Sequence, residues 1–175
     1  NGERDGEKRA DRERGHTTKR AYPTGREDTL RREPKEREES REPNELGGKN
    51  EDIVALDADL MIDCGLLSFR NSYPERFVEC GIAEQDMLSQ AGALALKGKL
   101  PISHSFACFL APRANEQFFN NASENTKCIY TGSLAGLLPS GPGHSHQMVR
   151  DISVLGGVPG LTLIEPCCEQ EVKMA

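Results

Sequence analysis

The sequence has 175 residues, a formal net charge of −6 and a hydrophobic content of 36%, which is enough for a globular domain. It contains no apolar run near the roughly 20 residues that a membrane-spanning helix needs, and its N-terminus lacks a signal-peptide pattern. The acidic charge argues against a nucleic acid as the natural partner. We therefore expect a protein that binds neither membrane nor nucleic acid.

Charge divides the chain into two unlike parts. The first 50 residues hold 27 charged side chains that nearly cancel, and Pro23, Pro34 and Pro43 interrupt any helix there. The low apolar content of this part predicts a disordered segment over residues 1–45. Residues 46–175 hold nearly all of the large apolar side chains and are long enough for one domain with a core. An RNA-binding arm would need a basic excess that this segment lacks. Translation of a GC-rich gene in the wrong frame would also produce such a tract, so whether it is native stays open.

From residue 52 onward, short apolar runs alternate with helical patterns. Each run is continuous rather than alternating, which is typical of parallel strands buried on both faces. We predict an α/β fold with a doubly wound, mostly parallel sheet of five to six strands and helices on both faces. The predicted strands are residues 52–56, 76–80, 100–104, 127–131 and 161–165. Helices are predicted from Ala83 to Gly98, over residues 106–121 and over residues 147–155.

Cysteines and acids were considered as metal ligands. The six cysteines show no CxxC spacing, which predicts free, buried thiols and a reducing, cytoplasmic location. Asp57, Asp59 and Asp63 follow the first strand, but an apolar Leu-Met-Ile insert spoils the alternation of a calcium loop. We predict no metal ligand in this chain.

Several chemically distinctive side chains follow the predicted strands. Parallel strands bring their carboxyl ends to one edge, where open α/β sheets bind ligands. Each residue also has an ordinary interpretation: Glu84 as a first-turn acid, Phe106 and Phe109 as core, and the histidines as loop residues. Their convergence on one edge favours a binding site. The candidates are Asp59, Glu84, Phe106, Phe109, His144 and His146.

Five segments, in order, carry a resemblance to a known family. They read DIVALDADL, ERFVECGIAEQDMLSQAGALAL, HSFACFLAPRANEQ, SGPGHSHQMVRDI and PGLTLIEPCCEQE. Together they resemble the pyrimidine-binding domain of transketolase-type enzymes, which depend on thiamine diphosphate. The resemblance extends from about residue 45 to residue 171.

The resemblance implies a role for each matching residue. Glu84 matches the glutamate that hydrogen-bonds the pyrimidine nitrogen N1′ and so helps the cofactor to form its ylid. Phe106 and Phe109 match an aromatic pair around the pyrimidine ring. Pro112 stands where transketolases often carry a third aromatic residue. Asp59 matches an aspartate near the middle of the cofactor.

The histidine loop departs from the sugar-phosphate pattern. Transketolases commonly have an acid before Gly-Pro-Ser/Thr-His, whereas this segment reads SGPGHSHQ. His146 matches the transketolase histidine, while His144 resembles the β subunit of 2-oxo acid dehydrogenases. The resemblance thus implies His144 and His146 as catalytic candidates beside Glu84, and it leaves the donor open.

The resemblance supplies no site for the diphosphate or its magnesium ion, which implies a partner. We expect a diphosphate-binding N-terminal transketolase section or subunit, in a dimer or heterotetramer, and an isolated chain that is inactive. The principal hypothesis is a transferase that moves a two-carbon ketol unit between sugar phosphates. Alternatives are a 2-oxo acid dehydrogenase β-like or deoxyxylulose-phosphate-synthase-like chain, and a non-catalytic fragment.

Overall fold

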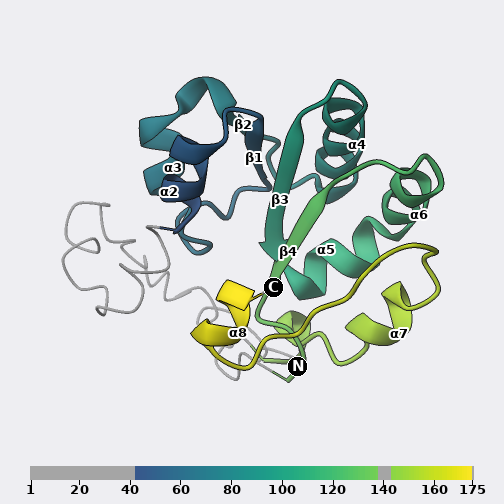
Figure 1. Ribbon diagram of the computed structural model, residues 1–175. Coiled ribbons are helices and arrows are strands. Elements are labelled where there is room, and N and C mark those ends of the chain that lie inside the picture. The colour runs from purple at the N-terminus through teal and green to yellow at the C-terminus, as the bar shows by residue number, and fades with distance from the viewer. Residues whose placement is uncertain (1–41, 138–142, 175) are drawn as a thin grey trace, which may run out of the picture. The chain divides into compact units, whose positions relative to one another are not determined.

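Four parallel strands form the centre of the fold, in the order β2-β1-β3-β4 (Figure 1). The computed structural model describes residues 42–137 and 143–174. The register places Asp57, the last residue of β1, beside Glu79 of β2 on one side and His104 of β3 on the other. The strands are β1 (Ile53–Asp57), β2 (Phe77–Glu79), β3 (Leu100–Phe106) and β4 (Ile129–Ser133).

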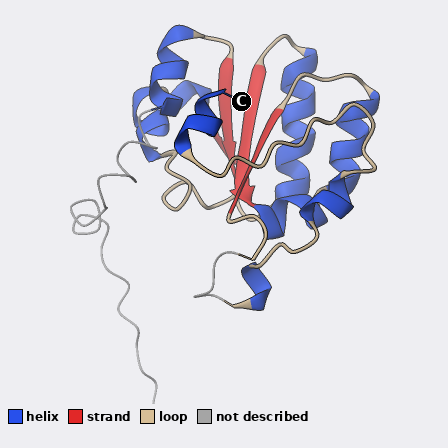
Figure 2. Ribbon diagram, turned by 60° about the horizontal axis from the view of Figure 1, so that its bottom comes forward, coloured by secondary structure: helices blue, strands red, loops and turns tan. Residues whose placement is uncertain are grey.

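Helices cover both faces of this sheet, as Figure 2 shows. Val54 and Leu56 face a core built with α4, α5 and α6, whereas Ile53 and Ala55 pack against Phe69 of α3. This confirms the predicted α/β fold with a parallel, doubly wound sheet. The α-helices are α2 (Glu42–Lys49), α3 (Leu67–Ser72), α4 (Glu84–Leu96), α5 (Ala107–Arg113), α6 (Asn115–Ser123), α7 (Asp151–Leu155) and α8 (Glu169–Met174). Two 3₁₀ turns, η2 (Pro74–Arg76) and η3 (His144–His146), complete the elements of the described residues.

The number of strands is smaller than predicted. Residues 161–165, the predicted fifth strand, form no strand, and Leu163 and Ile164 are 43% and 59% exposed. Among the strands of the described chain, β4 pairs only with β3. An apolar run becomes a strand only where a neighbouring edge accepts its hydrogen bonds, which local propensity does not specify. Within the described residues the sheet therefore has four strands.

The predicted helix over residues 106–121 is two helices. Phe106 ends β3, α5 stops at Arg113, and α6 starts at Asn115. Pro112 lies in the last turn of α5 and has no backbone N–H to continue the helical ladder. The predicted helix over residues 147–155 is likewise shorter and begins at Asp151. These breaks set the directions from which the loops reach the sheet edge.

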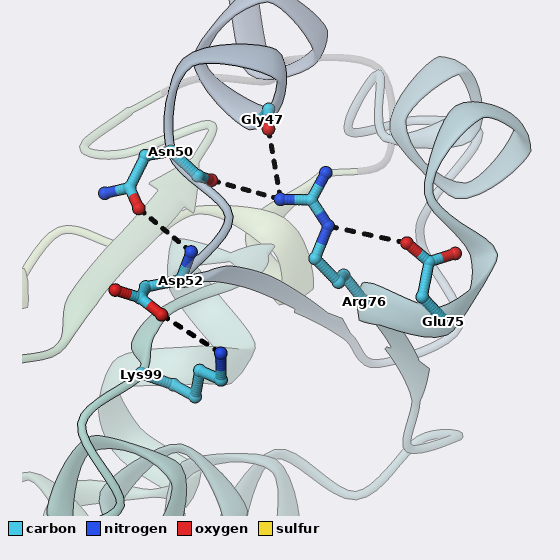
Figure 3. A network of polar contacts seen from close by, with 6 residues as sticks. All are labelled: Gly47, Asn50, Asp52, Glu75, Arg76 and Lys99. Carbon is cyan, nitrogen blue, oxygen red and sulfur yellow. Dashed lines mark hydrogen bonds and ion pairs between the residues drawn. The ribbon is translucent and has the colours of Figure 1, made fainter.

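Arg76 holds α2 onto the domain (Figure 3). Its guanidinium donates to the carbonyl oxygens of Gly47 and Asn50, both at 3.0 Å. These carbonyls belong to the end of α2, where a helix has no internal donors left, so Arg76 serves as a C-terminal cap. Nearby, Lys99 pairs with Asp52 at 3.0 Å. Helix α2 spans the predicted boundary at residues 45 and 46, and most of the predicted disordered segment lies outside the described residues.

The cysteines are less buried than the sequence predicts. All six cysteines are free, as predicted, but four are only partly buried, and Cys167 and Cys168 are exposed. Over residues 42–137 and 143–174, no helix has the length and apolar character required to cross a membrane.

Candidate active site

Glu84 is the first residue of α4 and lies at the sheet edge formed by the carboxyl ends of the strands. Only 3% of its surface is exposed, although Ile82, two residues earlier, is 74% exposed. A carboxylate in this position gains from the partial positive charge of the helix N-terminus. The preceding turn uses Gly81 at φ +67°, where a side chain would be strained. The buried carboxylate of Glu84 thus follows directly after a turn whose Ile82 side chain is exposed.

Arg113, at the end of α5, pairs with this buried acid. Its Nη1 donates to Glu84 Oε1 at 2.8 Å, while its side chain remains 43% exposed. The same guanidinium lies over the ring of Phe109, with its central carbon 4.2 Å from the ring centroid. A charge-assisted hydrogen bond offsets much of the cost of burying a carboxylate.

Three aromatic side chains gather beside this pair. The ring centroids of Phe106 and Phe109 lie 5.9 Å apart. His146 meets both rings edge-on, at 5.1 Å from Phe109 and 6.2 Å from Phe106. We call Glu84, Phe106, Phe109, Arg113 and His146 the acid–aromatic cluster. Its residues lie at the end of β3 or in the segments that follow β2, β3 and β4.

The two remaining candidates lie differently. His144 is exposed, and no ring contact joins it to the acid–aromatic cluster among the described residues. Asp59 is exposed and adopts a left-handed conformation with φ +61°. The structure thus brings together four of the six predicted residues, and the catalytic and cofactor roles of all six stay predictions.

Glu79 links the turn of Asp59 to the turn that precedes Glu84. Its Oε1 accepts the backbone N–H of Asp59 at 2.9 Å and that of Gly81 at 2.8 Å. One carboxylate oxygen therefore fastens the loops after β1 and β2 to each other. Glu79 was not among the residues predicted from sequence, because its partners depend on the pairing of the two strands.

A buried polar pair lies beneath this edge. Burial, reinforced by the charge of Glu79, raises the pKa of Asp57 from 3.8 to about 6, against the opposing hydrogen bond from the Leu60 amide. Burial also lowers the pKa of His104 from 6.5 to about 4. His104 Nε2 lies 2.7 Å from Ser133 Oγ, which keeps a neutral imidazole hydrogen-bonded. Burial therefore favours the neutral form of both side chains.

These two pKa shifts have opposite effects on stability between pH 4 and 6.5. Native Asp57 binds its proton more tightly than the unfolded chain, so its contribution is complete below pH 4 and is lost as pH rises to about 6. Native His104 binds its proton more weakly, so its contribution grows over nearly the same range. Each amounts to about 3 kcal/mol, since one pKa unit corresponds to about 1.4 kcal/mol. The two contributions to the pH dependence of the free energy of unfolding should therefore nearly cancel in the original chain.

Single substitutions should separate the two slopes. In Asp57→Asn, the free energy of unfolding should rise from pH 4 to 6.5, because only His104 then contributes. In His104→Gln, whose amide can still reach Ser133, it should fall over the same interval. Urea unfolding at several pH values would measure both. Parallel pH profiles for the two variants would contradict the assignment.

The side chains of the acid–aromatic cluster suit an aromatic nitrogen heterocycle. A buried carboxyl can hydrogen-bond a ring nitrogen, and two partly buried phenyl rings can stack on a planar ring. In the described part of the chain, no group of three or more His, Cys, Asp or Glu side chains could hold a metal ion.

Arg113 was missed by the sequence analysis, although a signal was present. Phe109 and Arg113 are four residues apart, so they share one face of α5. An arginine four residues after a candidate aromatic would have been a reasonable addition to the site. Its pairing with Glu84, 29 residues away, required the packing of α4 and α5.

The family comparison covers most of the chain. Residues 39–175 match the model described as transketolase, pyrimidine binding domain. A 6-deoxy-6-sulfo-D-fructose transketolase subunit of Clostridium sp. (strain MSTE9) is 34% identical over 75% of this chain and 41% of its own length. A 1-deoxy-D-xylulose-5-phosphate synthase of Natranaerobius thermophilus is 34% identical over 74% of this chain and 20% of its own.

A solved structure has the same architecture. It is described as a split gene transketolase in an inactive β4 tetramer, and it superposes with a TM-score of 0.59 at 35% identity. The match covers 71% of this chain and 40% of that one. The chain thus spans about two fifths of the length of the transketolase subunit and of the split gene transketolase.

Proposed function

Since this chain belongs to the family of transketolase pyrimidine-binding domains, we propose that it supplies the pyrimidine-binding half of a thiamine-diphosphate-dependent, transketolase-like transferase. The observation that carries this proposal is the buried Glu84 held beside Phe106, Phe109 and His146. When bound, the cofactor supplies a carbanion that the side chains of a protein cannot provide. The chain would bind and tune one end of it.

Each residue of the site has a distinct proposed task. Glu84 would hydrogen-bond the pyrimidine nitrogen and hold a proton at its buried carboxyl, away from competing water. Phe106 and Phe109 would hold the ring by offset stacking. His146, edge-on to both rings, would face the reacting end, with His144 as a second catalytic candidate. Asp59 would contact the middle of the cofactor from the turn that Glu79 fixes.

The proposal requires a second chain or section. A diphosphate-binding transketolase section would hold the diphosphate through magnesium, and the isolated chain would be inactive without it. The similarity to a transketolase subunit and to a split gene transketolase supports a partner section on a separate chain. We propose that the two sections assemble as a dimer or heterotetramer. The six free thiols suit a reducing cytoplasm.

The transferred group would be a two-carbon ketol unit, passed between sugar phosphates or related acceptors. A second candidate is a deoxyxylulose-phosphate-synthase-like or 2-oxo acid dehydrogenase β-like reaction. The similarity to a 1-deoxy-D-xylulose-5-phosphate synthase and the His144-Ser145 pair favour this alternative. A non-catalytic fragment would keep the same fold without turnover.

Reconstitution would test these readings. The chain would be co-expressed with the diphosphate-binding section encoded in the same genome and supplied with thiamine diphosphate and magnesium. We expect ketol transfer from a ketose phosphate to an aldose phosphate only when both chains are present. Decarboxylation of a 2-oxo acid instead would favour the second candidate. No turnover of either donor, from a complex that binds the cofactor, would contradict both.

A further inference from the structure

We propose that Arg113 is a positioning residue for Glu84, which orients the buried carboxylate and couples it to the aromatic side of the site. This inference rests on the proposed function for the role of Glu84 itself. It adds a residue that none of the predicted cofactor contacts includes.

The first support is the division of exposure between the two partners. Glu84 is 3% exposed, whereas the side chain of Arg113 is 43% exposed and reaches inward to Glu84 Oε1 at 2.8 Å. A hydrogen bond to a single carboxylate oxygen restricts rotation of the carboxyl group. Arg113 thereby fixes the direction in which the rest of the carboxyl group faces.

The second support is the position of the guanidinium over Phe109, 4.2 Å from the ring centroid. A planar guanidinium can stack on a ring and donate in its own plane at the same time, which an ammonium group cannot do. The ring of Phe109 also meets His146 edge-on at 5.1 Å. Arg113 therefore connects the acid after β2 with the aromatic and histidine groups that follow β3 and β4.

A purely structural arginine would show a different pattern. At the end of α5 a positive charge is favourable anyway, and full solvation would satisfy it. Here both the charge and the flat face contact residues of the acid–aromatic cluster. Loss of Arg113 would leave the buried carboxylate of Glu84 unpaired and free to reorient, so binding of the cofactor should weaken in addition to any loss of folding stability.

The test measures binding of thiamine diphosphate, with magnesium, to the complex of this chain and its diphosphate-binding partner. We expect Arg113→Ala to raise the Kd by about tenfold or more, because binding must then immobilise a Glu84 carboxyl group that Arg113 no longer orients. Arg113→Lys should recover part of the loss, because it keeps the charge but not the planar stack. Arg150→Ala, at an exposed arginine, is the matched control.

A double-mutant cycle with Glu84→Gln separates positioning from a general effect. Arg113→Ala should weaken binding much less in the Glu84→Gln background than in the original chain. Equal losses in both backgrounds, or an Arg113→Ala variant that behaves like Arg150→Ala, would overturn the inference. If Arg113→Ala does not fold, Arg113→Gln is judged by the same criteria. A Glu84→Gln variant that binds and turns over normally would instead overturn the proposed function.

Discussion

Replacing Glu84 by Gln should lower the thiamine-diphosphate-dependent turnover of the reconstituted complex by about 10²- to 10⁴-fold. The amide has nearly the same shape and can still accept the hydrogen bond from Arg113, so the fold should persist. It cannot, however, hold and release a proton at the ring nitrogen as a carboxyl group does. Steady-state rates at saturating cofactor would measure the loss.

The control for this substitution is Glu116→Gln, on the exposed surface of α6. It makes the same chemical change outside the acid–aromatic cluster, and its turnover should equal that of the original chain. Circular dichroism of both variants would show that the secondary structure is retained. If Glu84→Gln and Glu116→Gln were equally active, Glu84 would not be the cofactor-activating acid.

Gly92→Ala should destabilise the domain by about 2–4 kcal/mol, although alanine usually favours a helix. Gly92 lies on the buried face of α4, and an added Cβ would collide with the side chain of Asn121, with Cγ only 2.9 Å away. Asn121 is held in place, because its amide donates to Leu88 O and to Tyr130 Oη, both at 2.9 Å. This loss of stability combines overpacking with the loss of buried hydrogen bonds, and it exceeds the gain of about 1 kcal/mol from the higher helix propensity of alanine.

Removal of Asn121 provides the control for this prediction. In an Asn121→Ala background the obstruction is absent, so Gly92→Ala should be neutral or stabilising. Thermal unfolding should show a melting temperature lower by roughly 10 °C for Gly92→Ala alone, and no further decrease when it is added to Asn121→Ala. A Gly92→Ala variant as stable as the original chain would show that α4 and α6 can separate at little cost.

Several features of the fold and site follow from local pattern. Short, continuous apolar runs predicted parallel strands buried on both faces, and β1 is buried at all five positions. Parallel strands joined through helices bring their carboxyl ends together, so the six candidate residues were expected near one another, and four of them, Glu84, Phe106, Phe109 and His146, lie together. Each of these predictions depends only on residue type, spacing and the handedness of the connections.

Other features depend on contacts between distant segments. Arg113 meets Glu84 across 29 residues, and Asn121 meets Leu88 across 33. The hydrogen bond from the Asp59 amide to the Glu79 carboxylate follows from how β1 and β2 are paired. The pKa shifts of Asp57 and His104 follow from how neighbouring strands are paired and covered. The predicted strand over residues 161–165 differs for the same reason, since an apolar run does not determine its pairing partner.

The amino-acid sequence by itself determined the parallel α/β fold, the sheet edge at which the candidate site lies, and an acid that lies close to aromatic residues there. Hydrophobic period and chain direction encode these features locally. Only the tertiary structure decided that Arg113 holds that acid, that His146 rather than His144 contacts the aromatic pair, and that Glu79 fastens the two loops. Such partners are selected by helix and strand packing, which brings together side chains that no short stretch of sequence contains.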